Sequence, residues 1–171
     1  MRYAAMLLLL SMTCAKTPSD ATPTPAAPTA PASTTTTASQ TTGGPRVIFP
    51  DAFPVQVEIA ADDENRAQGL MYRDQLRPGA GMLFLFAEEG EYPFWMKNTR
   101  IPLDMIWIDS NRRIAAIHHD VPPCQIDDCP SYPPNAKARY VLEVAGGVAK
   151  QHGLKVGDIL RFEQTDDIVV R

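Results

Sequence analysis

The sequence predicts a mainly β fold, an antiparallel β-sandwich or barrel with one or two short helices. Three observations support this class: the apolar segments are short, most of them alternate with a period of two, and Gly or Pro separates them. The first 44 residues contain almost no aromatic or charged side chains, so the folded part begins near Pro45. Residues 45–171 are enough for a single domain whose core buries about two thirds of the surface of the unfolded chain.

The first half of this domain contains the strongest strand signals. Residues 55–59 alternate apolar and polar side chains, which predicts a strand with one buried face. Acidic residues at the start of 62–68 and Gly69 after it favour a helix of about two turns. Residues 82–86 and 105–108 are apolar without alternation, which predicts two strands covered on both faces.

The second half continues with short strands. Residues 110–112 are Ser, Asn and Arg, and they predict a hairpin loop after the strand at 105–108. Residues 146–152 favour a single helical turn closed by Gly153. Four further short strands are expected, at residues 114–117, 140–144, 159–162 and 168–170.

The N-terminus is typical of a bacterial export signal. Met1 and Arg2 form a short positive region, and the apolar stretch at residues 4–10 is too short to span a bilayer. Cys14 follows, as in lipoproteins whose cysteine becomes the lipidated first residue, so residues 1–14 are interpreted as a lipoprotein signal peptide. The alternative is ordinary cleavage near Ala15 and release of a soluble protein. Both interpretations predict export, and the lipoprotein interpretation predicts a membrane partner through the lipid.

Residues 15–44 are rich in Thr, Pro and Ala, with the run TTTT at residues 34–37. Such a composition buries too little apolar surface to offset the entropy of ordering the chain. We expect a disordered tether between the lipid and the domain. Ala15 replaces the Asp that is associated with retention in the inner membrane, which favours an outer-membrane lipoprotein facing the periplasm or the cell surface.

Charge and motif content argue against several functional classes. Arg2, Lys16 and Asp20 are the charged residues before residue 45, which leaves 14 Lys and Arg against 19 Asp and Glu in the domain. No basic stripe is present, so no nucleic-acid partner is predicted. The sequence contains no phosphate-binding loop, nucleophile elbow or zinc-protease motif, and no cofactor is predicted. An enzyme is therefore not favoured, although a dispersed site that includes Asp104 and Glu143 stays open.

Two cysteines lie close together in a proline-rich loop. In an exported protein, Cys124 and Cys129 are expected to form a disulfide that closes this loop. The alternatives are free thiols or a zinc or copper site that uses both thiolates with His118 or His119. Neighbouring residues on a strand point to opposite faces, so at most one of these histidines would face the loop.

The segment at residues 94–99, FWMKNT, places a cation and an amide beside large apolar residues. If residues 94–97 are extended, Trp95 and Lys97 share one face and could present an aromatic wall and a cation to a ligand. The alternative is structural: Lys97 pairs internally with Asp104 or Glu143, and Trp95 only packs.

Several blocks resemble, in order, the motifs of one family. The blocks are RAQGLMYR at 66–73, GMLF at 81–84, FWMKNT at 94–99, IPLD at 101–104, YVLE at 140–143 and GD at 157–158. The chain is similar, from about residue 55 to about residue 162, to the domain of unknown function 192 (DUF192) family. The resemblance implies a small mostly β domain of jelly-roll-like character, often exported in bacteria, without an established activity. A site carried over from the family would lie at Arg66, Trp95, Lys97, Asn98, Asp104 and Glu143.

Three functions remain open at this point. The first is non-catalytic binding of a small polar or glycan-like ligand, or of a protein partner, by an envelope-anchored domain. The second is an envelope hydrolase that uses Asp104 or Glu143 as acid or base. The third is a purely structural envelope protein. A pocket that holds both carboxyl groups would favour the hydrolase, and carboxyl groups on opposite faces would argue against it.

Overall fold

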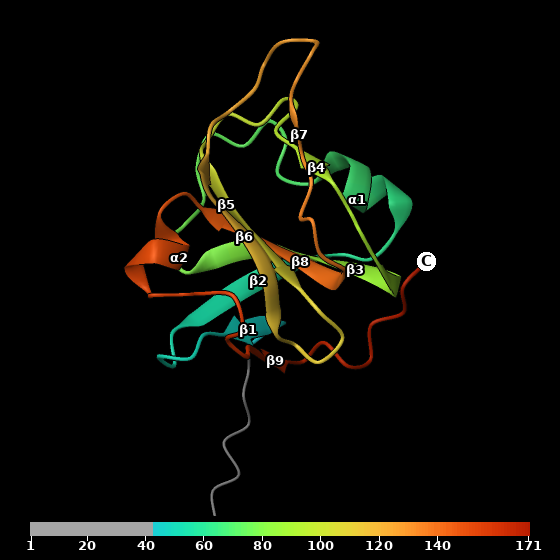
Figure 1. Ribbon diagram of the computed structural model, residues 1–171, viewed down its shortest axis with the longest axis vertical. Helices are drawn as coiled ribbons and strands as arrows, with labels where there is room; N and C mark the ends of the chain where they lie inside the picture. Colours follow the sequence, from blue (N-terminus) through green and yellow to red (C-terminus); the bar gives the residue numbers. More distant parts are fainter. Residues whose placement is uncertain (1–42) are drawn as a thin grey trace, which may run out of the picture. The chain divides into compact units, whose positions relative to one another are not determined.

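The structure, a computed structural model, describes residues 43–171. Its main feature is a seven-stranded sheet in the order β6-β5-β8-β3-β2-β1-β9 (Figure 1). The strands span Arg46–Ile48 (β1), Pro54–Ala60 (β2), Ala80–Gly90 (β3), Leu103–Ile108 (β5), Ile114–Val121 (β6), Ala138–Ala145 (β8) and Arg161–Glu163 (β9). The predicted mainly β class is confirmed.

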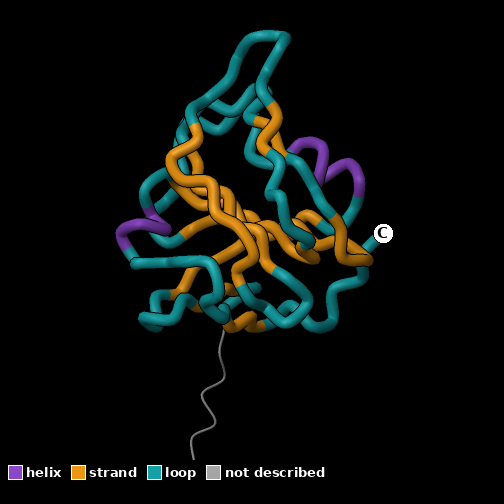
Figure 2. Tube along the Cα trace, viewed as in Figure 1, coloured by secondary structure: helices purple, strands orange, loops and turns teal. Residues whose placement is uncertain are grey.

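Two short strands and two short helices complete the described part. Strands β4 (Phe94–Trp95) and β7 (Ser131–Tyr132) pair antiparallel in a separate two-stranded sheet. Helix α1 spans Asp63–Gln68 and helix α2 spans Val148–Gln151. The tube view shows how little of the domain is helical (Figure 2). Among residues 43–171, no helix has the length and apolar character needed to cross a membrane.

One strand pair departs from the antiparallel prediction. β2 and β3 run parallel, with Val57 opposite Gly81 and Ile59 opposite Leu83. Parallel neighbours need a crossover connection, and residues 61–79, which include α1, provide it. The acidic N-terminus of α1 was predicted correctly: the Asp62 side chain accepts a hydrogen bond from the Asn65 backbone N–H at 2.9 Å and caps the helix.

The sheet curls until its two edges almost meet. β6 forms one edge and β9 forms the other. Residues 157–160, which lead into β9, form backbone hydrogen bonds with the start of β6 and with the turn before it. The Ile114 N–H donates to the Asp158 carbonyl at 2.8 Å, and the Leu160 N–H donates to the Arg112 carbonyl at 2.9 Å. This near-closure agrees with the predicted barrel-like architecture.

One predicted strand is wrong, and two strands were not predicted. Residues 168–170 form no strand, and Ile168 and Val170 are partly buried against the core as part of an irregular tail. β1 and β7 were missed because three and two residues are too few to show a period of two. The predicted signal peptide, the lipidation at Cys14 and the tether lie outside the described residues.

Each face of the sheet carries its own apolar cluster. The first cluster lies inside the curl and includes Leu142, Val144 and Ile106. The second lies on the other face and includes Phe84, Met105 and Trp107, and it packs against Phe94 of β4 and Tyr132 of β7. This second face, between the large sheet and the layer of α1, β4 and β7 above it in Figure 1, contains the candidate site.

Candidate functional site

The register of β5 and β8 separates the two predicted carboxyl groups. Asp104 lies opposite Val144, whereas Met105 lies opposite Glu143. Directly opposed residues share a face of the sheet, and successive residues alternate between faces. Asp104 therefore faces the first cluster with Val144, and Glu143 faces the second cluster with Met105. The acid pair that a hydrolase would need is not assembled.

Asp104 has a structural role in the described part of the protein. It is fully buried, and its Oδ1 accepts hydrogen bonds from the backbone N–H groups of Asp120 at 2.7 Å and Gly147 at 3.1 Å. Its Oδ2 accepts from the Ala149 N–H at 2.6 Å. These bonds join β5 to the end of β6 and to the start of α2, so both oxygens are occupied by the fold.

Glu143 is also buried, but no hydrogen bond from the described residues reaches its carboxyl group. Only 4% of its surface is exposed, and its cross-strand neighbours are Met82 on β3 and Met105 on β5. Its carboxyl group has no hydrogen-bond or ion-pair partner among residues 43–171. Burial disfavours the charged form and raises the pKa of Glu143 from 4.5 to about 8. At neutral pH this group is a protonated acid that can both donate and accept a hydrogen bond.

A small pocket reaches Glu143 from the surface. Its volume is about 30 Å³, which is room for one or two water molecules. The residues after β4 form one wall through Lys97 and Thr99, and the segment from α1 to Met71 forms another. The lining residues are Arg66, Ala67, Gln68, Gly69, Leu70, Met71, Phe84, Phe94, Trp95, Lys97, Thr99 and Glu143.

A larger groove adjoins this pocket. It has a volume of about 270 Å³ and is lined by Arg66, Ala67, Phe86, Tyr92, Pro93, Phe94 and Trp95. The pocket and the groove share Arg66, Ala67, Phe94 and Trp95. Trp95 is 53% exposed and forms part of both linings. The groove and the pocket together form a site with an aromatic wall and a carboxyl group at its floor.

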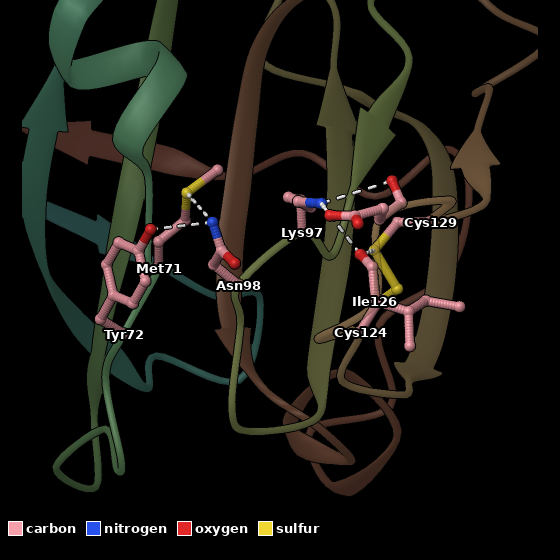
Figure 3. Close-up of polar contacts among 8 residues, drawn as sticks. Met71, Tyr72, Lys97, Asn98, Cys124, Ile126 and Cys129 are labelled. Atoms are coloured by element: carbon pink, nitrogen blue, oxygen red, sulfur yellow. Dashed lines mark hydrogen bonds and ion pairs between the residues drawn. A yellow bond between two sulfur atoms is a disulfide. The ribbon is translucent and has the colours of Figure 1, made fainter.

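Lys97 lines the pocket, but its ammonium group is directed to the cysteine loop (Figure 3). Its Nζ donates to the Ile126 carbonyl at 3.0 Å, to the Asp127 carbonyl at 3.3 Å and to the Asp127 Oδ1 at 3.0 Å. The alternative that Lys97 pairs with Asp104 or Glu143 is therefore wrong. Lys97 holds the loop against β4 instead of offering a free cation to a ligand.

The predicted disulfide is confirmed. The Sγ atoms of Cys124 and Cys129 are 2.06 Å apart. Both sulfur atoms are used in this bond, so the alternative metal site with the histidines does not form. His119 is exposed, and His118 lies with its Nε2 3.0 Å from the Pro133 carbonyl oxygen.

Arg66 is part of both cavities but is already bound by the fold. Its Nη1 donates to the Leu85 carbonyl at 2.9 Å, and its Nη2 donates to Asp63 Oδ1 at 2.7 Å and to the Arg171 carbonyl at 2.6 Å. Its guanidinium group also lies 5.6 Å from the centre of the Phe86 ring. The side chain therefore connects α1 to β3 and to the C-terminus.

Asn98 lies in the turn that follows β4, with a left-handed φ of 56°. Its Nδ2 donates to the Tyr72 hydroxyl at 2.9 Å and lies 3.8 Å from the Met71 sulfur (Figure 3). The Tyr72 N–H donates in return to the Asn98 carbonyl at 2.9 Å. Asn98 thus fixes the wall of the pocket that contains Met71 and is not itself in the lining.

Four of the six predicted site residues therefore line the same pocket: Arg66, Trp95, Lys97 and Glu143. Sequence analysis missed the aromatic groove, because Phe86 and Tyr92 look like ordinary strand and loop residues. Their rings stack with centres 3.6 Å apart. Thr99 was also missed as a lining residue, although it lies in the FWMKNT block and is only 4% exposed.

Comparison with known proteins agrees with this architecture. The model of the DUF192 family, described as "Uncharacterized ACR", matches residues 47–162. The chain belongs to the DUF192 family. The region matched contains both cavities, the disulfide loop and all six predicted site residues. No curated protein matches the chain.

Two solved structures are similar to this DUF192 protein. One is a protein from Sinorhizobium meliloti 1021 described as a candidate transcription regulator, with 38% identity and a TM-score of 0.61, covering 69% of this chain and 91% of that one. The other is a protein of unknown function from Novosphingobium aromaticivorans DSM 12444, with 33% identity and a TM-score of 0.61, covering 68% of this chain and 82% of that one.

Proposed function

We propose that this DUF192 domain is a non-catalytic binding module of the bacterial cell envelope, and that it holds a small polar, glycan-like ligand. The observation that carries the proposal is Glu143, a buried carboxyl group that no side chain of the described part satisfies, at the floor of a pocket beside the exposed Trp95. A buried polar group without a partner costs free energy, and ligand sites are where such groups obtain their partner. An exposed aromatic ring suits the apolar face of a sugar.

Binding is favoured over hydrolysis by the composition of the pocket. Glycoside hydrolysis uses two carboxyl groups on either side of the bond that is cleaved. Glu143 is the one carboxyl group among the lining residues, and Asp104 faces the other side of the sheet. Glu143 can orient a ligand, but it has no second carboxyl group in the lining to activate a water molecule or to act as a nucleophile.

The description of the S. meliloti protein as a candidate transcription regulator does not lead us to propose a nucleic-acid ligand. Proteins that bind DNA neutralise phosphates with clustered Lys and Arg. Here acidic residues outnumber basic ones, 20 to 16 in the whole chain. The two cations of the pocket, Arg66 and Lys97, are held by carbonyl and carboxylate oxygens.

A thermal-shift screen of the full-length chain against neutral sugars, charged sugars and cell-wall fragments tests the proposal. A ligand that binds only the native state adds RT ln(1 + [L]/Kd), about 2.7 kcal/mol at a hundredfold excess over Kd. We expect Trp95→Ala to remove the shift and Val169→Ala, a matched change at another exposed residue, to keep it. A screen without any shift would instead favour a structural role.

Anchoring to the outer membrane through Cys14 is part of the same proposal. It rests on the N-terminal sequence, in which a short apolar region precedes the cysteine and a polar, proline-rich stretch follows. We expect the protein to fractionate with outer membranes and Cys14→Ser to move it to the soluble periplasmic fraction. Retention of the variant in the membrane would show that another segment anchors the chain.

A further inference from the structure

We propose that the group that enters the Glu143 pocket is a primary ammonium, so that the ligand is an amine-bearing small molecule whose remaining atoms occupy the aromatic groove. This inference rests on the proposed binding function and specifies the class of ligand. It follows from the size of the pocket, from the charges around it and from the aromatic side chains at its mouth.

The size of the pocket decides which part of a ligand can reach Glu143. About 30 Å³ admits a group of the size of a water molecule and excludes a sugar ring. A primary ammonium or a hydroxyl group fits, whereas a trimethylated ammonium is too large. The ring or chain that carries the group must lie outside, and the adjoining groove of about 270 Å³ has room for it.

The charges around the pocket favour the ammonium over the hydroxyl. Lys97 donates its protons to Ile126 and Asp127, and Arg66 donates to Leu85, Asp63 and Arg171. The residues opposite Glu143 on the neighbouring strands, Met82 and Met105, carry no charge. No cation of the described residues is therefore directed at the carboxyl group, and an entering ammonium would complete an ion pair. A hydrogen bond between charged partners is about twice as strong as a neutral one.

Aromatic rings at the mouth of the pocket add to the same preference. Phe94 and Trp95 line both the pocket and the groove, and an aromatic face attracts a cation within about 6 Å of its centre. The groove is also held in shape before a ligand arrives. Phe86 stacks on Tyr92, and Trp107 Nε1 donates to the Tyr92 carbonyl at 2.8 Å. A preformed site loses less conformational entropy on binding.

Binding of an ammonium has a proton balance that can be measured. Burial raises the pKa of Glu143 to about 8, so at pH 7 the free protein holds the proton on this carboxyl group. Pairing with a cation favours the carboxylate and lowers its pKa. The complex therefore forms between the carboxylate and the intact ammonium, and the proton of Glu143 is released to the buffer. A neutral hydroxyl ligand leaves that proton in place.

Titration calorimetry of the full-length chain at pH 7 tests the inference with two matched probes, 2-aminoethyl β-glucoside and 2-hydroxyethyl β-glucoside. An alkyl ammonium stays charged at this pH, as Lys does. Measurements in phosphate and in Tris, which differ in ionisation enthalpy, give the number of protons exchanged. We expect release of close to one proton with the amine, no exchange with the alcohol, and an affinity for the amine that is higher by about tenfold or more.

A third probe, 1,5-diaminopentane, separates the sources of the ammonium. Tighter binding of the aminoethyl glucoside identifies a sugar as the carrier, and equal binding of the diamine identifies an alkyl amine such as that of a peptide side chain. We expect Glu143→Gln to abolish proton release and to reduce the affinity for the amine by about tenfold or more, so that the preference for the amine over the alcohol is lost. Asp128→Asn, a change of an exposed acid in the cysteine loop, serves as the control.

The outcomes distinguish this inference from the proposed function. Equal binding of the two glucosides without proton release overturns the ammonium and leaves a binding module for neutral sugars. Failure of all three probes also overturns it. In that case a ligand found in the thermal-shift screen would still support the proposed binding function. A screen without any shift would overturn the proposed function as well as the ammonium inference.

Discussion

Replacing Glu143 with glutamine is expected to stabilise the domain at pH 7 and to remove a large part of its loss of stability between pH 5 and pH 8. The folded state raises the pKa of this carboxyl from 4.5 to about 8. Between these values the folded state keeps a proton that the unfolded state has lost. The contribution of Glu143 to the free energy of unfolding is therefore highest below pH 4.5 and falls as the pH rises towards 8.

The size of this effect follows from the shift. Each pH unit between the two pKa values changes the free energy of unfolding by about 1.4 kcal/mol, so the step from pH 5 to pH 7 costs about 2–3 kcal/mol. Glutamine has nearly the same shape and does not ionise. Urea unfolding of the wild type and of Glu143→Gln at several pH values gives the difference directly.

Other carboxyl groups do not obscure the comparison. The pKa of Glu58 is lowered by its hydrogen bond to Arg73, and that of Asp62 is lowered by its bonds to Asn65. Groups of this kind add stability as the pH rises through the acid range, and they do so equally in both proteins. Parallel stability curves for the two proteins would contradict a raised pKa at Glu143 and would weaken the case for a site at this residue.

Mutation of Asp104, in contrast, is expected to destabilise the domain strongly. In Asp104→Asn an amide nitrogen replaces one of the two oxygens that accept backbone N–H bonds. If it replaces Oδ2 it faces the Ala149 N–H, and if it replaces Oδ1 it faces those of Asp120 and Gly147. At least one buried donor then loses its acceptor in either orientation. Asp104→Ala leaves all three N–H groups without their acceptor and is expected to lower the free energy of unfolding by about 3–5 kcal/mol.

Urea unfolding measures this loss, with Asp128→Asn as a matched change at an exposed acid that should be nearly neutral. Hydrogen exchange should locate the effect at the end of β6 and at α2, where the three N–H groups lie. If Asp104→Asn kept full stability but lost ligand binding, Asp104 would belong to a binding site and its structural role would be wrong.

The two acids show where sequence analysis succeeds and where it ends. Asp104 and Glu143 both stand out as acids in apolar strands, and the family resemblance marks both. Their different roles depend on the pairing of Met105 with Glu143, which is a long-range register that local patterns do not contain. The strands themselves were predictable because residues 55–59 and 105–108 follow local rules of alternation and apolarity.

Other features depended on contacts between distant segments. Gly81 of β3 lies opposite Val57 of β2 and Val144 of β8, and a Cβ atom there would lie 2.5 Å from the Glu143 carbonyl oxygen of β8. The role of Lys97 depends on a loop about 30 residues further along the chain. The disulfide, in contrast, was predictable from two cysteines close in sequence in a chain whose N-terminus is typical of an export signal.

The near-closure of the curled sheet has a consequence for how the chain folds. β9 pairs with β1, so the last strand completes an edge that the first strand begins, and residues 157–160 bind the start of β6. Contacts between residues so far apart in sequence give a high contact order, which slows folding. The sheet cannot be finished until β9 is present. A chain of this topology therefore stays incompletely folded on the ribosome until residues 161–163 have been synthesised and released.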